Sequence, residues 1–171
     1  MQDQPGPRWL SAEQQQAWVA FVAATVWLPD ALDAQLQRDA GITHVEYQVM
    51  SWLSMRPDRR AGRMSEIASL ANVSLSHLSR IAARLEKQGW LRRTPDPDDG
   101  RGTLATLTEA GWDKVAATAP GHVAEVQRLI FDNLTATQVH QLHTISETIL
   151  QAAKPHLCLP RPPVAPHVSR Q

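Results

Sequence analysis

Cysteine is almost absent from this chain of 171 residues, and tyrosine and phenylalanine are rare. The single cysteine, Cys158, cannot form a disulfide within the chain, so disulfide-stapled secreted scaffolds are excluded. Net charge is also missing, because Lys plus Arg and Asp plus Glu number 17 each. Overall charge therefore gives no indication of a polyanionic partner, and binding to nucleic acid requires a local excess of positive charge.

Long apolar runs are absent as well. The longest stretch of low polarity, residues 17–28, is well short of the about 20 residues that span a bilayer. The N-terminus lacks a basic start followed by an apolar segment and a small-residue cleavage site. We therefore expect a soluble, cytoplasmic protein with no membrane partner.

The motifs of common enzymes and metal sites are also missing. The sequence has no Gly-x-Ser-x-Gly elbow, no phosphate-cradling glycine loop and no His-Glu-x-x-His pair, so we expect neither an enzyme nor a cofactor. His140 and His143 lie three residues apart, with His122 as a third candidate, but no Cys or carboxylate completes a zinc site. The acidic segment 95–102 lacks the ligand spacing of a calcium loop. The sequence therefore predicts no metal.

Helix starts are the clearest positive signal. Ser or Thr precedes six apolar segments of helical spacing, at Ser11, Thr43, Ser65, Ser74, Thr108 and Thr135. Three of these have the capping-box partner three residues later, at Gln14, Glu46 and Gln138. The pattern predicts a first helix over 12–39, bent at Pro29 and ended by Gly41, and a second helix over 45–55.

The second half of the chain predicts two helices after a hairpin. Short extended runs at 90–94 and 103–107 flank a polar segment and indicate a β-hairpin with a long tip. A helix over 109–132, interrupted at Pro120, and a last helix over 136–154 follow. The expected fold class is therefore mainly α (α+β), with six helices and one hairpin.

Residues 64–81 have the spacing of a helix-turn-helix. Asn72 stands where the tight turn requires a residue that tolerates positive φ. We expect the second helix, which Ser74 opens, to bury the apolar residues Leu75, Leu78, Ile81 and Leu85. Its outward face then carries a polar and basic set: Ser76, His77, Arg80, Arg84 and Lys87.

This outward set predicts contacts to DNA, because an α-helix fits the major groove of B-DNA. Residues near the N-terminus of such a helix meet base edges, which indicates Ser76, His77 and Arg80. Phosphate contacts are expected from Ser74 with the first amides of the helix, and further along from Arg84 and Lys87.

The hairpin tip adds a second candidate contact. Arg101 suits the adjacent minor groove, and Asp99 suits a charge-assisted pair that holds its guanidinium. Residues 56–101 contain ten Lys or Arg against six Asp or Glu, whereas the remainder has seven against eleven. This segregation of charge lets a neutral chain bind a polyanion through one surface.

Two runs carry a family resemblance: Arg84-Leu-Glu-Lys-Gln-Gly-Trp-Leu-Arg-Arg93 and Asp99-Gly-Arg-Gly-Thr-Leu-Ala-Thr-Leu-Thr108. They resemble the winged helix-turn-helix of the MarR family of bacterial transcription regulators. The Asp-x-Arg pair and the following Leu-Thr are the most specific part. The resemblance implies a homodimer that straddles a pseudopalindromic operator, and usually repression that a small ligand relieves.

The resemblance also implies an organisation of the chain. One domain covers 8–154, in which the segments 11–39 and 109–154 form the dimer and 43–107 binds DNA. The dimer has independent support, because the first and last helices carry more apolar surface than a small winged domain can cover. The proline-rich segment 155–171 is expected to be a disordered tail.

The family resemblance also implies a site for a small aromatic or anionic effector between the dimerisation helices and the DNA-binding lobe. Trp18, Tyr47 and Trp52 are the candidate lining residues, although large aromatics on helix faces are more often core. The alternative to a DNA-binding regulator is a winged-helix protein-interaction adaptor that does not bind DNA. The outward basic set favours the regulator.

Overall fold

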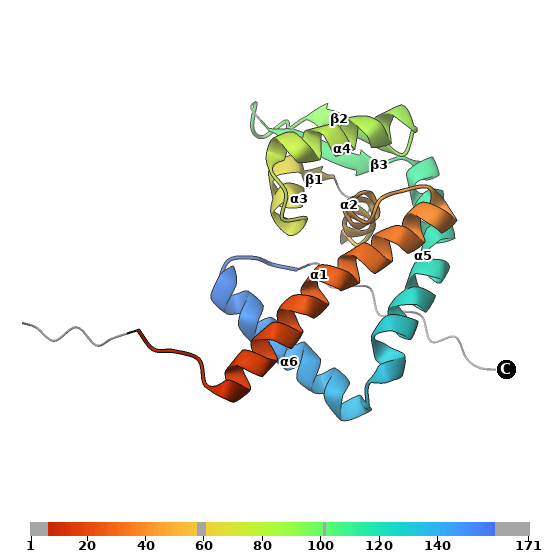
Figure 1. Ribbon diagram of the computed structural model, residues 1–171. Helices are drawn as coiled ribbons and strands as arrows, with labels where there is room; N and C mark the ends of the chain where they lie inside the picture. Colours follow the sequence, from red (N-terminus) through yellow and green to blue (C-terminus); the bar gives the residue numbers. More distant parts are fainter. Residues whose placement is uncertain (1–6, 58–60, 101, 160–171) are drawn as a thin grey trace, which may run out of the picture.

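The computed structural model describes residues 7–57, 61–100 and 102–159. Its elements are, in chain order, α1 (Ala12–Ala40), α2 (His44–Ser54), β1 (Gly62–Arg63), α3 (Met64–Leu70), α4 (Leu75–Lys87), β2 (Leu91–Pro95), β3 (Thr103–Leu107), α5 (Glu109–Leu129) and α6 (Ala136–Ala153) (Figure 1). A 3-10 turn over Phe131–Asn133 precedes α6. The mainly helical fold with a hairpin is confirmed, and β1 is an element that the sequence did not predict.

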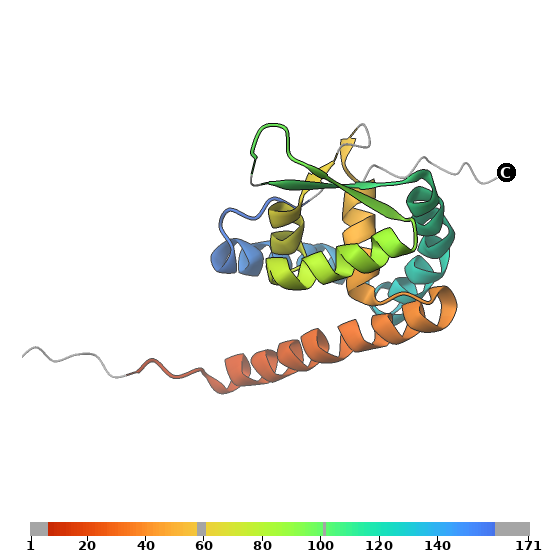
Figure 2. The same cartoon turned by 90° about the horizontal axis from the view of Figure 1, so that it is seen from above.

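The helices divide into a lobe around the sheet and a set of longer helices beside it (Figures 1 and 2). Helices α2, α3 and α4 pack around an antiparallel sheet of strand order β1-β3-β2. In the hairpin, Leu91 pairs with Leu107 and Pro95 with Thr103. Helix α1 packs against α2 and α5, and its N-terminal half runs clear of the lobe in Figure 2.

Side-chain caps explain where most helices begin. Five predicted caps accept a hydrogen bond from the backbone N–H three residues later: Ser11, Thr43, Ser74, Thr108 and Thr135. The three predicted capping boxes are present, and Gly41 ends α1 in the left-handed conformation. The prediction for Ser65 is wrong. Helix α3 begins at Met64, directly after β1, because the pairing of β1 with β3 already sets the direction of the chain.

The core lies between α2, α3, α4 and the sheet. Its largest fully buried side chains are Leu36, Val49, Met50, Ile67, Leu78, Ile81 and Leu85. Three of the four apolar residues predicted inward on α4 belong to it. Leu75 does not, because the first turn of α4 projects beyond the core and leaves this side chain 55% exposed.

Neither proline inside a long helix interrupts it. Helix α1 continues through Pro29, and α5 continues through Pro120 and Gly121 to Leu129. The predicted interruption at Pro120 is therefore wrong. A proline removes one backbone donor, but packing of α5 against α1 and α2 stabilises the helix.

Apolar side chains of α1 and α6 are exposed in the single chain. On α1 these include Trp18, Val19, Val26 and Trp27, and on α6 Leu142, Ile145 and Ile149. By length and composition, α1 is able to cross a membrane: an 18-residue window has a mean hydropathy of 1.3, and 6% of that window is buried. The length argument from the run 17–28 therefore does not hold for the whole helix. The core helix of a soluble protein and a signal sequence near the N-terminus meet the same criteria of length and composition.

Candidate nucleic-acid interface

Helices α3 and α4 form the predicted helix-turn-helix. The turn between them contains Asn72, whose φ of 49° is the positive value that the sequence indicated. Val73 N donates to Ala68 O at 3.0 Å and closes the turn. Small, buried Ala68 allows the two helices to cross closely. The local sequence therefore fixes the angle at which α4 leaves α3.

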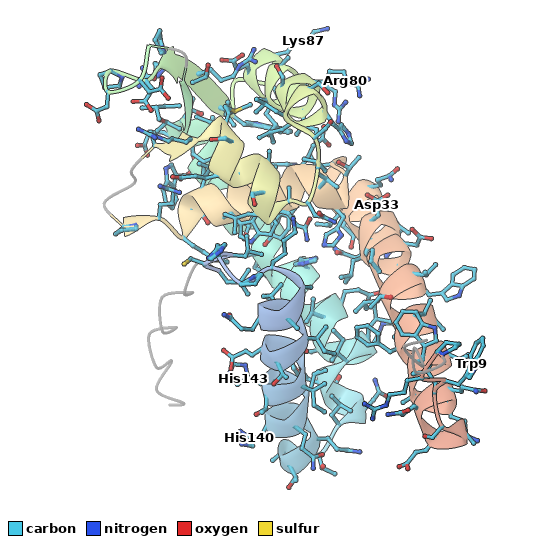
Figure 3. All side chains as sticks on the ribbon, turned by 90° about the vertical axis from the view of Figure 1, so that its left-hand side faces the viewer. Trp9, Asp33, Arg80, Lys87, His140 and His143 are labelled. Atoms are coloured by element: carbon cyan, nitrogen blue, oxygen red, sulfur yellow. The ribbon has the colours of Figure 1, made fainter. Side chains whose placement is uncertain are left out.

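The predicted contact residues lie on the outer side of α4. Ser76, His77, Arg80, Arg84 and Lys87 are all exposed. Figure 3 shows Arg80 and Lys87 pointing away from the chain at the end opposite His140 and His143. Ser74 Oγ accepts from His77 N at 3.2 Å and lies 3.1 Å from Ser76 Oγ, so it acts as the helix cap. The structure therefore brings the predicted set together on one face.

Arg84 differs from the rest of the set because it has a partner within the chain. Its Nε donates to Glu46 Oε1 on α2 at 2.8 Å, and its side chain is 56% exposed against 11% for Glu46. Burial raises the pKa of Glu46, but hydrogen bonds from Thr43 and Arg84 outweigh burial and leave this pKa below its ordinary value. Glu46 is therefore a carboxylate held in its charged form beneath α4.

Two further ion pairs hold the hairpin, which forms the wing. Arg63 Nε lies 2.9 Å from Asp96 Oδ2, and the Asp96 side chain is only 3% exposed. This oxygen receives no hydrogen bond of good geometry from the described residues, so the Arg63 charge compensates its burial. Asp96 Oδ1 accepts from Asp98 N at 3.0 Å, and Asp96 N donates to Gly102 O at 3.0 Å. The first aspartate of the acidic segment is thus structural.

The second pair joins β2 to α4. Arg93 Nε donates to Glu86 Oε2 at 2.8 Å, and its Nη1 donates to Ser79 Oγ at 3.3 Å. Glu86 Oε1 accepts from Arg93 N at 2.8 Å. The side-chain hydrogen bond from Arg93 lowers the pKa of Glu86 below its ordinary value. Sequence reasoning missed Arg63, Asp96, Arg93 and Glu86, because only the fold brings these charges together.

A partly open cavity of about 400 Å³ lies between the wing and the first turns of α3 and α4. Arg63 and Arg93 are the two basic residues of its wall, and Leu75 and Met64 supply apolar surface. Asp99 also lines it, and Asp99 O accepts from Gly102 N at 2.7 Å. Arg101, the predicted minor-groove contact, lies outside the described residues, so its pairing with Asp99 stays a prediction.

A polar cluster joins the lobe to the long helices. The rings of Tyr47 on α2 and His122 on α5 have centroids 4.6 Å apart, and His44 lies 6.0 Å from His122. His122 Nδ1 is 3.4 Å from Oε1 of buried Gln35 on α1. Burial lowers the pKa of both histidines, the effect on His44 being opposed by Asp33 and that on His122 reinforced by His44. Burial likewise raises the pKa of Tyr47.

The candidate effector residues lie on different elements. Tyr47 is buried in the cluster with His122, Trp52 is partly buried on α2, and Trp18 is 58% exposed on α1. None of the three lines the cavity beside the wing. His122 lies in the polar cluster, whereas His143 is on α6 with Glu147 Oε2 at 3.4 Å. Among the described residues no group of three or more His, Cys, Asp or Glu suits a metal.

Comparison with known proteins identifies relatives of this chain. The family profile described as MarR family matches residues 42–103. Sco3205, a MarR family transcriptional regulator from Streptomyces coelicolor solved in complex with DNA, is 44% identical, with a TM-score of 0.81 over 90% of this chain and 98% of that one. AbsC, a MarR family regulator from the same organism, is 31% identical, with a TM-score of 0.79 over 88% and 100% of the two chains.

Curated sequences give the same result over a shorter span. The repressor IacR of Pseudomonas putida is 31% identical over 90 residues, which cover 50% of this chain and 51% of that protein. The chain spans about half the length of the curated relatives it matches. Over nearly the whole of Sco3205 and AbsC, however, both sequence and fold agree. The outward face of α4, the wing and these likenesses together show that the chain belongs to the MarR family.

Proposed function

We propose that this chain is a sequence-specific regulator of transcription that binds double-stranded DNA as a homodimer and represses at an inverted-repeat operator. The observation that carries the proposal is the exposed polar and basic face of α4, on a chain 44% identical to a regulator solved with DNA. Repression is supported by the likeness to IacR, which is named a repressor. Because these relatives are regulators of transcription, we propose no enzymatic activity for this chain.

Contacts to DNA are assigned by position along α4 and the wing. Ser76, His77 and Arg80, near the helix N-terminus, meet base edges in the major groove. Ser74 with the first amides of α4 meets a phosphate, as does Lys87 one turn beyond Arg84. At the wing tip, Arg101 enters the minor groove and Asp99 supports it. Arg84 shares the outward face, but Glu46 already engages its Nε.

A second copy of the chain covers the apolar faces of α1 and α6. Trp18, Val19 and Trp27 on α1 are between 58% and 71% exposed, and Ile145 on α6 is 56% exposed. Exposed apolar faces of this kind are typical of surfaces that bind another protein. A two-fold dimer carries its recognition helices to successive major grooves, roughly 34 Å apart. The natural target is therefore an inverted repeat.

The remaining parts of the proposal concern effector and location. A small aromatic or anionic effector binds between the dimerisation helices and the lobe, where Tyr47 and Trp52 lie on α2, with Trp18 as the third candidate. The domain covers 8–154, followed by the tail 155–171. The protein works in the cytoplasm, at the nucleoid when it is bound to DNA.

Selection of bound sequences from random duplexes, at a stated salt concentration, tests the proposal. Enrichment of an inverted repeat with half-sites about one helical turn apart is expected. Sedimentation of the free protein is expected to give the mass of two chains. Failure to enrich any sequence at low salt contradicts DNA binding and favours the protein-interaction alternative, whereas enrichment of a single half-site by a monomer contradicts the dimer.

A further inference from the structure

The Arg84–Glu46 ion pair distinguishes Arg84 from the other basic residues on the outer face of α4. The guanidinium Nε lies 2.8 Å from Glu46 Oε1, and the two residues are 38 positions apart in the chain. Among the described residues, no ion pair is recorded for Arg80 or Lys87 on the same helix. The pair therefore joins the recognition helix α4 to a different helix, α2.

Glu46 is itself held firmly. Its Oε2 accepts from Thr43 N at 2.8 Å and from Thr43 Oγ1 at 3.0 Å, and Glu46 N donates back to Thr43 Oγ1 at 3.2 Å. Oε1 is left for Arg84. A nearly buried carboxylate with both oxygens occupied is oriented by its surroundings. The arginine adapts to the carboxylate, because the carboxylate is fixed by the start of α2.

The start of α2 is tied in turn to the long helix α1. His44 N, in the first turn of α2, donates to Asp33 Oδ1 on α1 at 2.7 Å. Only Gly41, Ile42 and Thr43 separate the end of α1 from α2. A series of polar contacts therefore runs from α1, through the capping box of α2, to the last turn of α4. In the dimer proposed above, α1 is a subunit-joining helix, so this series connects the dimer interface to the recognition helix.

We propose that Arg84 is a positioning residue: by its ion pair with Glu46 it fixes α4 relative to α1 and so sets the distance between the two half-sites that the dimer reads. This inference rests on the proposed function. It assigns to Arg84 a role other than the phosphate contact that its charge and helical position suggest. Specificity for half-site spacing then depends on a contact made within the protein.

The two roles predict opposite effects for Glu46→Gln. Glutamine keeps an acceptor for the capping box but removes the negative charge beside Arg84. If Arg84 binds a phosphate, this change leaves DNA binding equal or tighter, because the arginine loses a competing anion. If Arg84 positions α4, binding to the selected operator weakens about tenfold, as expected for loss of one coupled charged contact. The preference for that half-site spacing over spacings one or two base pairs longer or shorter also declines.

The experiment measures affinity on the selected operator and on this spacing series, over a range of salt, for the wild-type chain, Glu46→Gln, Arg84→Gln and the double variant. Both single variants are expected to weaken binding similarly, the double variant no further, and the slope of log affinity against log salt to stay at the wild-type value. Lys87→Gln, one turn along the same face, is the matched control. Its slope is expected to fall by about 0.9 per subunit, or about 1.8 for the dimer, with the spacing preference retained.

Three results overturn the inference: wild-type spacing preference in Glu46→Gln, additive losses in the double variant, or a slope reduced by about 0.9 per subunit in Arg84→Gln. Arg84→Lys adds a check, since lysine keeps the charge for a phosphate but not the guanidinium geometry. It is expected to behave like Arg84→Gln in the spacing series. If the wild-type chain selects no DNA, the proposed function fails by itself, and thermal unfolding of the same four proteins still measures whether the pair couples α2 to α4.

Discussion

Gly111 offers a sharp test of how α5 is joined to the wing. This residue lies in the first turn of α5, where a Cβ would stand 2.0 Å from the carbonyl oxygen of Trp90 and 3.2 Å from Leu107 Cδ2. Real Cβ atoms essentially never come closer than 3.0 Å to such atoms. Gly111→Ala therefore requires the start of α5 and Trp90, the residue before β2, to move at least 1.0 Å further apart.

That displacement is costly because Trp90 is held on both sides. Trp90 N donates to Leu85 O at 3.0 Å, and its carbonyl oxygen accepts from Thr108 N at 3.1 Å. Overpacking costs about 1–3 kcal/mol, and weakening one such hydrogen bond adds about 1 kcal/mol. Replacing Gly by Ala in a helix returns at most about 1 kcal/mol. We expect Gly111→Ala to lower the free energy of unfolding by about 2 kcal/mol.

The assay is thermal unfolding at one fixed protein concentration, because a dimer's melting temperature depends on concentration. For a chain of this size, 2 kcal/mol corresponds to a fall of roughly 4–8 °C. Gly121→Ala is the control, since its Cβ meets only Gln35 Nε2 at an ordinary 3.6 Å. It is expected to melt at or slightly above the wild-type temperature. A melting temperature for Gly111→Ala equal to that of Gly121→Ala would refute the reasoning.

Three further predictions concern base reading, the wing and pH. His77→Ala is expected to relax base preference at particular operator positions by about 1–3 kcal/mol, measured by binding to single-base operator variants; equal losses on cognate and scrambled DNA would contradict it. Arg101→Ala is expected to weaken binding most where the flanks are A·T-rich, and insensitivity to flank composition in the same assay would count against minor-groove insertion. Because burial lowers the pKa values of His44 and His122 in the folded state, the free energy of unfolding is highest above their unfolded pKa of 6.5 and falls as pH drops toward the lowered values. In urea unfolding at pH 7.5 and 5.5, this decrease is expected to be smaller for His122→Gln than for the wild type, and an equal decrease would exclude His122 as a source.

Features encoded by neighbouring residues were predictable from the sequence. The capping boxes at Ser11, Thr43 and Thr135 need only a partner three residues away. The positive φ of Asn72 and the outward face of α4 follow from the spacing of a few positions. Such features depend on local backbone geometry, which the sequence determines directly.

Contacts between distant segments were not predictable. The Arg84–Glu46 pair joins residues 38 positions apart, and His122 lies 87 positions from Gln35. Nothing in the sequence around Asp96 separates it from the two aspartates that follow, yet it alone of the three is buried. Charge patterns along the chain show how many acids and bases a segment has, but only packing decides which of them neutralise each other.

The pairing of charges inside the lobe also changes what the sequence count means. Arg63, Arg84 and Arg93 are each paired with an acid, Asp96, Glu46 and Glu86 respectively. These arginines therefore contribute less to the outer field than the count of ten basic residues in 56–101 implies. The positive surface depends instead on outward residues such as Arg80 and Lys87, which Figure 3 shows pointing away from the lobe. Only basic residues that are not already neutralised release counterions from DNA. We therefore expect the slope of log affinity against log salt concentration to correspond to fewer than ten phosphates per subunit.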